Sequence, residues 1–151
     1  MVDVLTVAQR RLNMSRIRHK DTRPELLLRR GLFSKGFRFR LHRRDLPGKP
    51  DVVFAKHRVC LFFNGCFWHG HSCSLFKTPK TRTTFWVEKI AHNRLRDKAA
   101  INLLIESGWR VLVVWECAIR GPNRQTLSDV IDHCAKIIAG SQTTRFFQVA
   151  G

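Results

Sequence analysis

The stretch DVVFAKHRVCLFF, residues 51–63, decides the fold of this chain of 151 residues. It contains two apolar runs, residues 51–55 and 58–63, which a short polar break separates. Runs of this length are typical of β-strands, so we expect a hairpin or two adjacent central strands. Residues 109–115 form a third continuous apolar run, which predicts a strand buried on both faces.

Helical patterns precede and follow these strands in the sequence. Thr22 and Glu25 have the spacing of a capping box, and they predict a helix that Gly36 ends. Apolar residues at helical spacing predict two further helices, over residues 84–106 and 127–139. The sequence therefore predicts an α/β fold in which helices flank a mixed central sheet.

The remaining segments complete the predicted organisation. Residues 37–41 alternate like a half-buried strand, and residues 64–79 are expected to form an irregular loop. We expect a single domain over residues 21–140, a basic arm over residues 1–20 and a flexible tail over residues 141–151.

Charge indicates the binding partner. The chain carries 28 Lys and Arg residues against 11 Asp and Glu residues, a formal net charge of +17 at pH 7. Such a surface attracts polyanions, because neutralised phosphates release their counterions. A nucleic acid is the expected partner, and a non-specific, ribosome-like basic protein is the alternative. No apolar run is long enough to cross a bilayer and no secretory segment opens the chain, so we expect no membrane partner and a cytoplasmic, nucleoid-associated protein.

Cysteine and histidine gather in the loop that follows the second apolar run. Cys66, His71 and Cys73 lie within eight residues, and Cys117 follows the strand at residues 109–115. Soft ligands at this spacing predict a structural zinc site, with Cys117 as the fourth ligand and His69 as a rival to His71. The alternative is a set of free buried cysteines.

Asp51 opens the first apolar run directly after Pro50. A carboxylate at a strand tip on a basic protein is suited to Mg²⁺-dependent hydrolysis of a phosphodiester, although a solvated turn aspartate would have the same pattern. The acidic-x-Lys triplet of many nucleases is absent from the next strand, which ends in Phe63 and Asn64. His69 is the nearest candidate for the catalytic base.

One face of the predicted helix at residues 84–106 carries two polar residues among apolar ones. Asn93 and Asp97 interrupt this stripe, and buried polar groups must find partners. Asp97 is predicted either to orient a neighbouring Arg or His for structural reasons, or to orient His69 for catalysis. Glu25 likewise belongs either to the capping box or to an active site.

Three aromatic residues occur in polar, basic sequence instead of in the predicted strands, namely Phe67, Trp68 and Trp86. Aromatic side chains in such places can insert between base pairs or stack on exposed bases. The alternative for each of them is ordinary core packing.

At these residues the sequence resembles the very short patch repair endonucleases, which nick one strand at T:G mismatches. The resemblance runs from about residue 13 to residue 121. Its motifs are PGKPD (47–51), GCFWH (65–69), EKI (88–90) with Asn93 and Asp97, GWRVL (108–112) and WECA (115–118).

The resemblance implies a fold like that of type II restriction enzymes with an added zinc site. It implies that zinc binds Cys66, His71, Cys73 and Cys117, and that Mg²⁺ binds Asp51 and the backbone carbonyl of Phe63. His69 would activate water beside Asp97, with Glu25 and Asn64 as further active-site candidates. The implied DNA contacts are Phe67, Trp68 and Trp86 from the major groove, Met14 from the minor groove, and Lys89 and Asn93.

The implied reaction is a nick 5′ to a thymine that arose by deamination of 5-methylcytosine, leaving a 5′-phosphate. We expect a monomer, with other repair proteins among its partners. Phe63 and Asn64 depart from the better-studied pattern, which has a hydroxyl residue and a histidine there. The alternatives are a zinc-stabilised DNA-binding protein that lost catalysis through these changes, or a restriction-like nuclease of other specificity.

Overall fold

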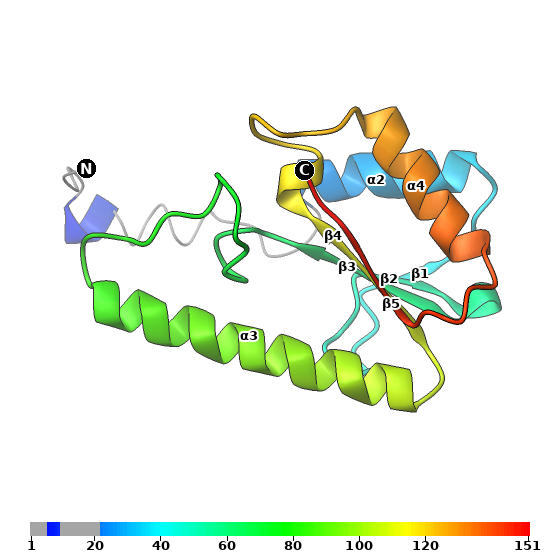
Figure 1. Cartoon of the computed structure of the whole chain (residues 1–151), viewed down its shortest axis with the longest axis horizontal. Helices are drawn as coiled ribbons and strands as arrows, with labels where there is room; N and C mark the ends of the chain where they lie inside the picture. Colours follow the sequence, from blue (N-terminus) through cyan, green and yellow to red (C-terminus); the bar gives the residue numbers. More distant parts are fainter. Residues whose placement is uncertain (1–5, 10–21) are drawn as a thin grey trace.

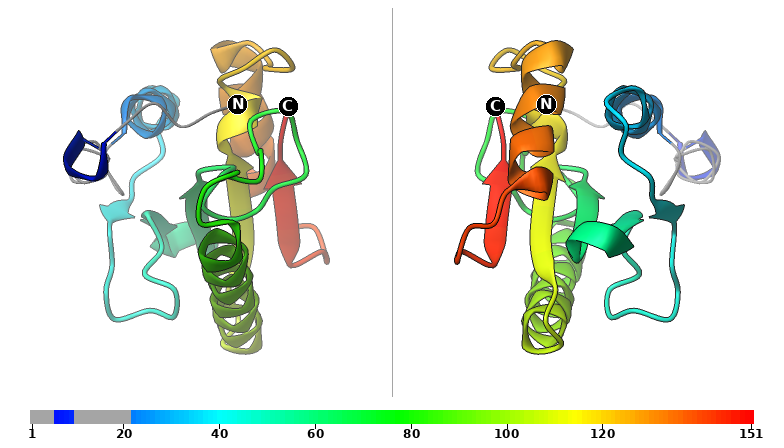
Figure 2. Two further views of the ribbon diagram at one scale, coloured as in Figure 1. Left: turned by 90° about the vertical axis from the view of Figure 1, so that its left-hand side faces the viewer. Right: turned by 90° about the vertical axis from the view of Figure 1, so that its right-hand side faces the viewer.

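The computed structural model describes residues 6–9 and 22–151. Most of the predicted basic arm, including Met14, lies outside these residues. A five-stranded sheet in the order β1-β2-β3-β4-β5 forms the middle layer. Helices α2 and α4 cover one face of the sheet and α3 covers the other (Figures 1 and 2). The bounds are α2 (Arg23–Ser34), β1 (Arg40–Leu41), β2 (Val52–Phe54), β3 (Val59–Asn64), α3 (Thr83–Glu106), β4 (Arg110–Trp115), α4 (Leu127–Ala139) and β5 (Phe146–Val149).

The two apolar runs of residues 51–63 form an antiparallel hairpin, as predicted. Strands β2 and β3 pair with Val52 opposite Leu61, and the 3-10 turn η1 (Ala55–His57) joins them. Strand β4 pairs in parallel with β3, and β5 pairs in parallel with β4, so the sheet is mixed. This confirms the α/β class with a mixed central sheet.

The strands alternate their side chains between two apolar layers, as the period of two requires. On β4, Leu112 and Val114 join the layer under α2 and α4, whereas Val111 and Val113 join the layer under α3. All four side chains are buried. The prediction of a strand buried on both faces is therefore confirmed for β4.

The helices begin and end close to the predicted positions. Helix α3 is stopped by Gly108, whose φ of +92° places it in the left-handed region that favours glycine. The N–H of Trp109 donates to the carbonyl of Leu104, and that of Gly108 to Ile105, which is a Schellman motif. Among the described residues, no helix is long and apolar enough to pass through a bilayer.

The predicted capping box at α2 is wrong for Thr22. Its side chain caps no backbone N–H, and its buried hydroxyl has no hydrogen-bond partner in the described part of the chain. Glu25 is buried at 2% exposure and pairs with Arg29 at 3.3 Å. The carboxylate belongs to a polar cluster beneath α2 that also contains Asp51, which favours the active-site interpretation of Glu25.

The structure differs from the sequence-based expectations at both edge strands of the sheet, β1 and β5. The strand predicted at residues 37–41 pairs only at Arg40–Leu41, although Phe37 and Phe39 still pack against the core. The tail predicted to be flexible contains β5, whose Val149 is 1% exposed. An apolar edge strand gains backbone hydrogen bonds and side-chain burial together, which outweighs the cost of ordering a short terminal segment.

Replacing Val149 tests whether β5 belongs to the fold. Val149→Ala removes two buried methyl groups and should cost about 2 kcal/mol of stability. The melting temperature should then fall by about 4–8 °C, measured by circular dichroism. Thr144→Ala, at an exposed position just before β5, is the control and should change it little. Equal melting temperatures for both variants would show that β5 contributes nothing.

Candidate active site

The candidate site lies where β3 and β4 end. These strands are parallel, and their last pair sets Asn64 beside Trp115. The loop after β3 and the 3-10 turn η2 (Glu116–Ala118) after β4 therefore leave the sheet at one edge. Asn64 is 8% exposed at this edge, so the loop that carries the site residues starts from a buried residue of the sheet.

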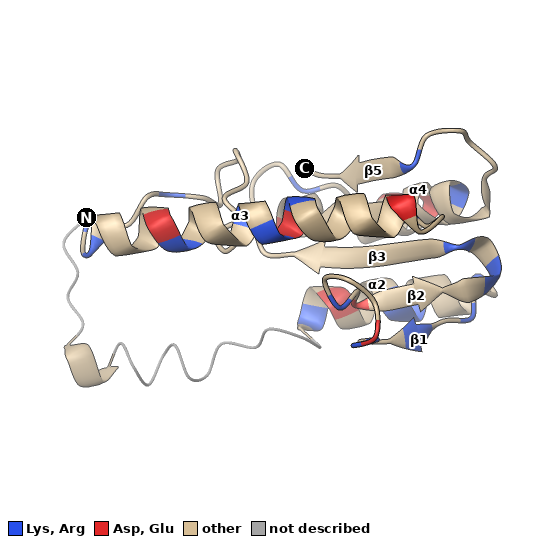
Figure 3. Cartoon of the chain, turned by 90° about the horizontal axis from the view of Figure 1, so that it is seen from below, with Lys and Arg blue, Asp and Glu red and all other residues tan. Residues whose placement is uncertain are grey.

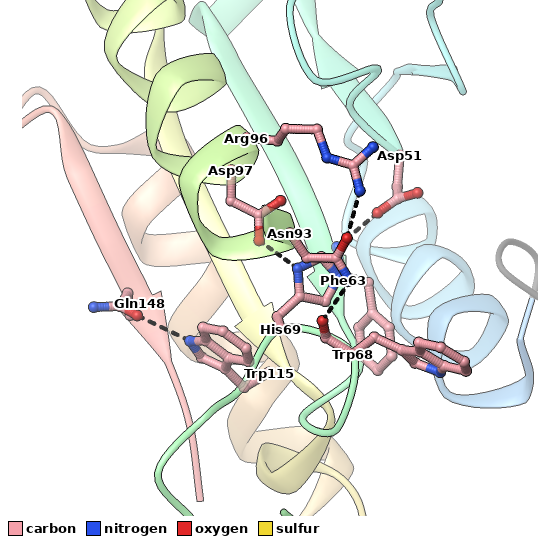
Figure 4. Close-up of polar contacts among 9 residues, drawn as sticks. All are labelled: Asp51, Phe63, Trp68, His69, Asn93, Arg96, Asp97, Trp115 and Gln148. Atoms are coloured by element: carbon pink, nitrogen blue, oxygen red, sulfur yellow. Dashed lines mark hydrogen bonds and ion pairs between the residues drawn. The ribbon is translucent and has the colours of Figure 1, made fainter. Parts of the chain in front are cut away.

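His69 and Asp97 form the centre of the site (Figure 4). The His69 ring nitrogen Nδ1 bonds the Asp97 carboxylate oxygen Oδ2. His69 comes from the loop after β3, whereas Asp97 comes from the middle of α3. The structure thus brings together the predicted pair, with Asp97 on the face of α3 that is turned toward the sheet edge.

Asn93 lies one turn before Asp97 and holds the loop. Its Nδ2 donates to the backbone carbonyl of Trp68 at 2.9 Å, and its Oδ1 accepts from Arg96 Nη2. Figure 4 shows these contacts beside the His69–Asp97 pair. The two polar residues that interrupt the apolar stripe therefore both serve the loop: Asn93 fixes its backbone and Asp97 its histidine.

Three aromatic side chains of the loop and of α3 pack together next to this pair. The rings of Phe67, Trp68 and Trp86 meet edge to face, with centroids 5.3 to 5.7 Å apart. All three are only partly buried. Edge-to-face contacts hold the rings as one rigid projection, and the partial exposure leaves their outer edges available to a ligand.

A groove runs past these aromatic residues and the His69–Asp97 pair. Five basic side chains are among those that line it: Arg44, Lys49, Arg82, Lys89 and Arg96. Val7, in the N-terminal segment, also lies along the groove. Figure 3 marks Lys and Arg in blue along α3 and in the loop between β1 and β2, the segments from which most of these side chains come. A groove of this charge is suited to a phosphate backbone.

Asp51 lies on the other side of the end of β3 (Figure 4). Its Oδ2 accepts a hydrogen bond from the backbone N–H of Phe63 at 2.7 Å. The pKa of the Asp51 carboxyl is raised to about 7, chiefly by burial and also by the nearby Glu25 carboxyl, while the hydrogen bond from the Phe63 N–H lowers it. Burial makes the charged form of this carboxylate unfavourable, and a bound cation would stabilise that form.

Four predicted ligands form a compact cluster: Cys66, His71, Cys73 and Cys117. One ligand atom from each lies within 4.8 Å of all the others. The Nδ1 atom of His71 is 3.7 Å from the sulfur of Cys66 and 3.5 Å from that of Cys117. A tetrahedral zinc site with ordinary bond lengths has S···N separations of about 3.6 Å, so the cluster fits such an ion.

The surroundings of this cluster suit metal-bound thiolates. The backbone N–H of Cys117 donates to the sulfur of Cys66 at 3.4 Å, and that of Gly151 donates to the sulfur of Cys117 at 3.4 Å. Burial lowers the pKa of His71, which favours the neutral imidazole that binds metals. His69, the predicted rival, bonds Asp97 and is not part of the cluster.

Trp115 connects the two histidines. Its ring stacks on His71 at 4.2 Å between centroids and meets His69 edge to face at 6.2 Å. Its Nε1 donates to Gln148 Oε1 on β5 at 2.9 Å (Figure 4). Strand β5 thus supports the ring that lies between the Cys/His cluster and the His69–Asp97 pair.

Three residues of this region were missed by sequence reasoning. His42, after β1, lies beside Asp51 and Glu25. Arg96 holds Asn93, and Gln148 holds Trp115. Arg96 could have been found from its place three residues after Asn93 on a helix, where side chains meet. Nothing in the sequence marks His42 or Gln148, because their partners lie in other segments.

Comparisons with known proteins agree with this geometry. The family described as DNA mismatch endonuclease Vsr matches residues 2–75. The chain is 46% identical to DNA mismatch endonuclease Vsr of Escherichia coli over 140 residues, which are 93% of this chain and 90% of that protein. It is 47% identical to the type II nicking enzyme V.XorIIP of Xanthomonas oryzae over 134 residues, which are 87% of this chain and 98% of the relative.

A third relative, the type II nicking enzyme V.NmeAIP of Neisseria meningitidis, is 43% identical over 80% of this chain and 86% of its own length. The family match over residues 2–75 includes the Asp51 hairpin and the loop residues Cys66, His69, His71 and Cys73. The chain therefore belongs to the Vsr family of DNA mismatch endonucleases, which are enzymes that act on DNA.

Proposed function

We propose that this enzyme nicks one strand of double-stranded DNA on the 5′ side of the mismatched thymine in a T:G pair, in a reaction that requires Mg²⁺. The observation that carries the proposal is the meeting of the Asp51 carboxylate and the His69–Asp97 pair around the end of β3. The basic groove beside them offers a path for the phosphate backbone. The relatives named nicking enzymes support cleavage of a single strand.

His69 is the proposed general base. Because Asp97 occupies Nδ1, the other ring nitrogen, Nε2, is left to accept a proton from the attacking water. Asp97 fixes the orientation of the ring and stabilises the imidazolium that forms when the proton arrives. Trp115 packs against both histidine rings and limits their movement.

Asp51 is the proposed ligand of the catalytic metal. A strand residue directs its N–H and its carbonyl to the same neighbour, so the Phe63 carbonyl faces the side from which Asp51 accepts the Phe63 N–H. Carboxylate and carbonyl oxygens are the ligands that Mg²⁺ prefers. When bound, Mg²⁺ supplies positive charge that polarises the scissile phosphate and orients its oxygens.

We propose that the three packed aromatic residues, together with α3, recognise the mismatch. Phe67, Trp68 and Trp86 would enter the stack at the weakened T:G pair, while Lys89 and Asn93 line the groove beside them. Zinc in the Cys66, His71, Cys73 and Cys117 cluster would hold this loop to the end of β4. One such site cuts one strand, so we propose that a monomer acts; other repair proteins remain expected partners.

Removing one cluster ligand tests the zinc proposal. Cys73→Ser should lose the metal and much of the stability, because structural zinc is coupled to folding. Elemental analysis of the gel-filtered protein, together with thermal unfolding, measures both effects. His69→Ala is the matched control, since this nearby histidine bonds Asp97 and should leave one zinc per chain. Well-folded wild-type protein without zinc would contradict the proposal.

Substituting the metal carboxylate separates catalysis from binding. Asp51→Asn should abolish nicking of a T:G duplex in Mg²⁺ and leave duplex binding within about twofold, because the charge that attracts the metal is lost. Gel-resolved nicking and fluorescence anisotropy measure the two activities. Asp132→Asn, at an exposed carboxylate that pairs with Lys35, is the matched control and should nick normally.

Asn64 provides the test of lost catalysis. If wild type, Asn64→His and Asn64→Asp all bind T:G duplexes but none nicks them in Mg²⁺ or Mn²⁺, the chain is a DNA-binding protein. Nicking by wild type, or its recovery in either variant, supports the enzyme.

The His69–Asp97 pair should control the rate of the chemical step. His69→Ala should slow single-turnover nicking by about 10²–10⁴-fold, which is the usual contribution of a general base. Asp97→Asn should slow it less, because the imidazole remains but loses the charge that stabilises its protonated form. Duplex affinity should stay the same in both variants. A rate within threefold of wild type for His69→Ala would assign the proton transfer to another group.

Trp68 should matter most at mismatched DNA. Trp68→Ala should weaken binding to a T:G duplex by about tenfold or more and change binding to the matched duplex little, because unstacking is cheapest at a mismatch. Val87→Ala, at an exposed apolar position on α3 directly after Trp86, is the control. If Trp68→Ala only lowers the melting temperature and leaves the mismatch preference intact, Trp68 serves the core.

A further inference from the structure

His42 lies beside the carboxylate of Asp51 and belongs to none of the sequence motifs on which the family resemblance rests. It follows β1 with a φ of 49°, and its backbone N–H donates to the carbonyl of Asp51 at 2.9 Å. This backbone contact fixes the start of the side chain next to Asp51. The His42 ring nitrogen Nδ1 lies 3.8 Å from Asp51 Oδ1, and both side chains are about one-fifth exposed.

Glu25 completes a group of three from α2, the segment after β1 and the start of β2. One ligand atom each from Glu25, His42 and Asp51 lies within 4.8 Å of the other two. Arg29 pairs with Glu25 Oε2 at 3.3 Å. Three segments that are far apart in the sequence therefore converge on one small, largely buried space.

The separations in this group suit a six-coordinate divalent ion. With metal–oxygen bonds of about 2.1 Å, neighbouring ligand atoms are about 3.0 Å apart and opposite ones about 4.2 Å apart. The 3.8 Å between His42 and Asp51 falls within that interval. The carboxyl groups of Glu25 and Asp51 also repel each other when both are charged, and a cation between them removes this repulsion.

We propose that His42 is a nitrogen ligand of the catalytic metal, together with Asp51 and Glu25, so that the site binds Mn²⁺ and Co²⁺ markedly better than an all-oxygen site does. The inference rests on the proposed function only in placing the metal at Asp51. Imidazole nitrogen is a ligand of first-row transition ions, and more so of Co²⁺ than of Mn²⁺, whereas Mg²⁺ takes oxygen ligands. With His42 as a ligand, the active site would therefore bind a wider range of divalent metal ions.

Pulsed electron paramagnetic resonance of bound Mn²⁺ tests this ligand without measuring catalysis. The probe is Mn²⁺ added to zinc-loaded protein, with and without a T:G duplex, so that the Cys/His cluster is already filled. Wild type should show the ¹⁴N coupling of a directly bound imidazole. His42→Asn tolerates the left-handed backbone and should lose this coupling, with Mn²⁺ affinity falling at least tenfold and Mg²⁺ affinity falling less.

Two controls make the result specific to His42. His133→Gln, at an exposed histidine on α4, should keep both the coupling and the affinity. Asp51→Asn should lose Mn²⁺ binding altogether. If His42→Asn fails to fold, ¹⁵N-histidine labelling of the unaltered chain replaces it, and the nitrogen coupling must then change to that of ¹⁵N.

The outcomes distinguish this inference from the function on which it rests. Mn²⁺ that binds in an Asp51-dependent manner without nitrogen coupling would overturn the role of His42 and leave the metal at Asp51. Coupling and affinity that persist in His42→Asn would do the same. Mn²⁺ binding that is unaffected by Asp51→Asn, or absent from wild type, would overturn both the inference and the placement of the metal.

Discussion

The parallel register between β3 and β4 is the constraint on which the rest of the site depends. Because Asn64 pairs with Trp115, the loop after β3 and the turn after β4 leave the sheet side by side. This one register brings Cys66 and Cys117 within reach of the same ion, and it places Trp115 between His69 and His71. A shift of the pairing by one residue would turn these side chains to the opposite faces and separate both groups.

The distribution of carboxylates follows from the strong positive charge of the chain. Several acidic side chains pair with a Lys or Arg side chain, as in the pairs Lys35–Asp132 and Arg120–Glu116. Asp51 has no Lys or Arg partner of this kind among the described residues and lies beside the buried carboxyl of Glu25. Such an arrangement costs stability in the absence of a cation. In a chain with 28 basic residues, this arrangement agrees with the proposal that Asp51 binds a cation.

The sequence predicted the elements whose signals are local. The apolar runs of the β2–β3 hairpin and of β4, and the helical periods of α3 and α4, all have their cause within the segment itself. The Cys/His cluster was predictable for the same reason, since three of its four ligands lie within eight residues. The resemblance to the Vsr family supplied the roles proposed for Asp51 and His69, because spacing alone left them open.

The features that were missed depend on contacts between distant segments. Strand β5 is short, and the free edge of β4 on which it forms cannot be read from residues 146–149 alone. Thr22 and Glu25 have the spacing of a capping box, but Glu25 is buried beside Asp51. Arg110 interrupts the apolar run of β4, yet it is 7% exposed because its guanidinium donates to the carbonyls of Ile137 and Ile138 at the end of α4.

The two departures from the family pattern have different consequences. Phe63 contacts Asp51 through its backbone N–H, so the change of side chain leaves this contact in place. Asn64 is different, because its side chain occupies the buried end of β3 and lines the groove. The change from histidine to asparagine there removes one imidazole from the site, while His42 places another next to Asp51 from the opposite segment. His42 therefore sets an imidazole ring 3.8 Å from Asp51, and it does so from the segment after β1 and not from β3.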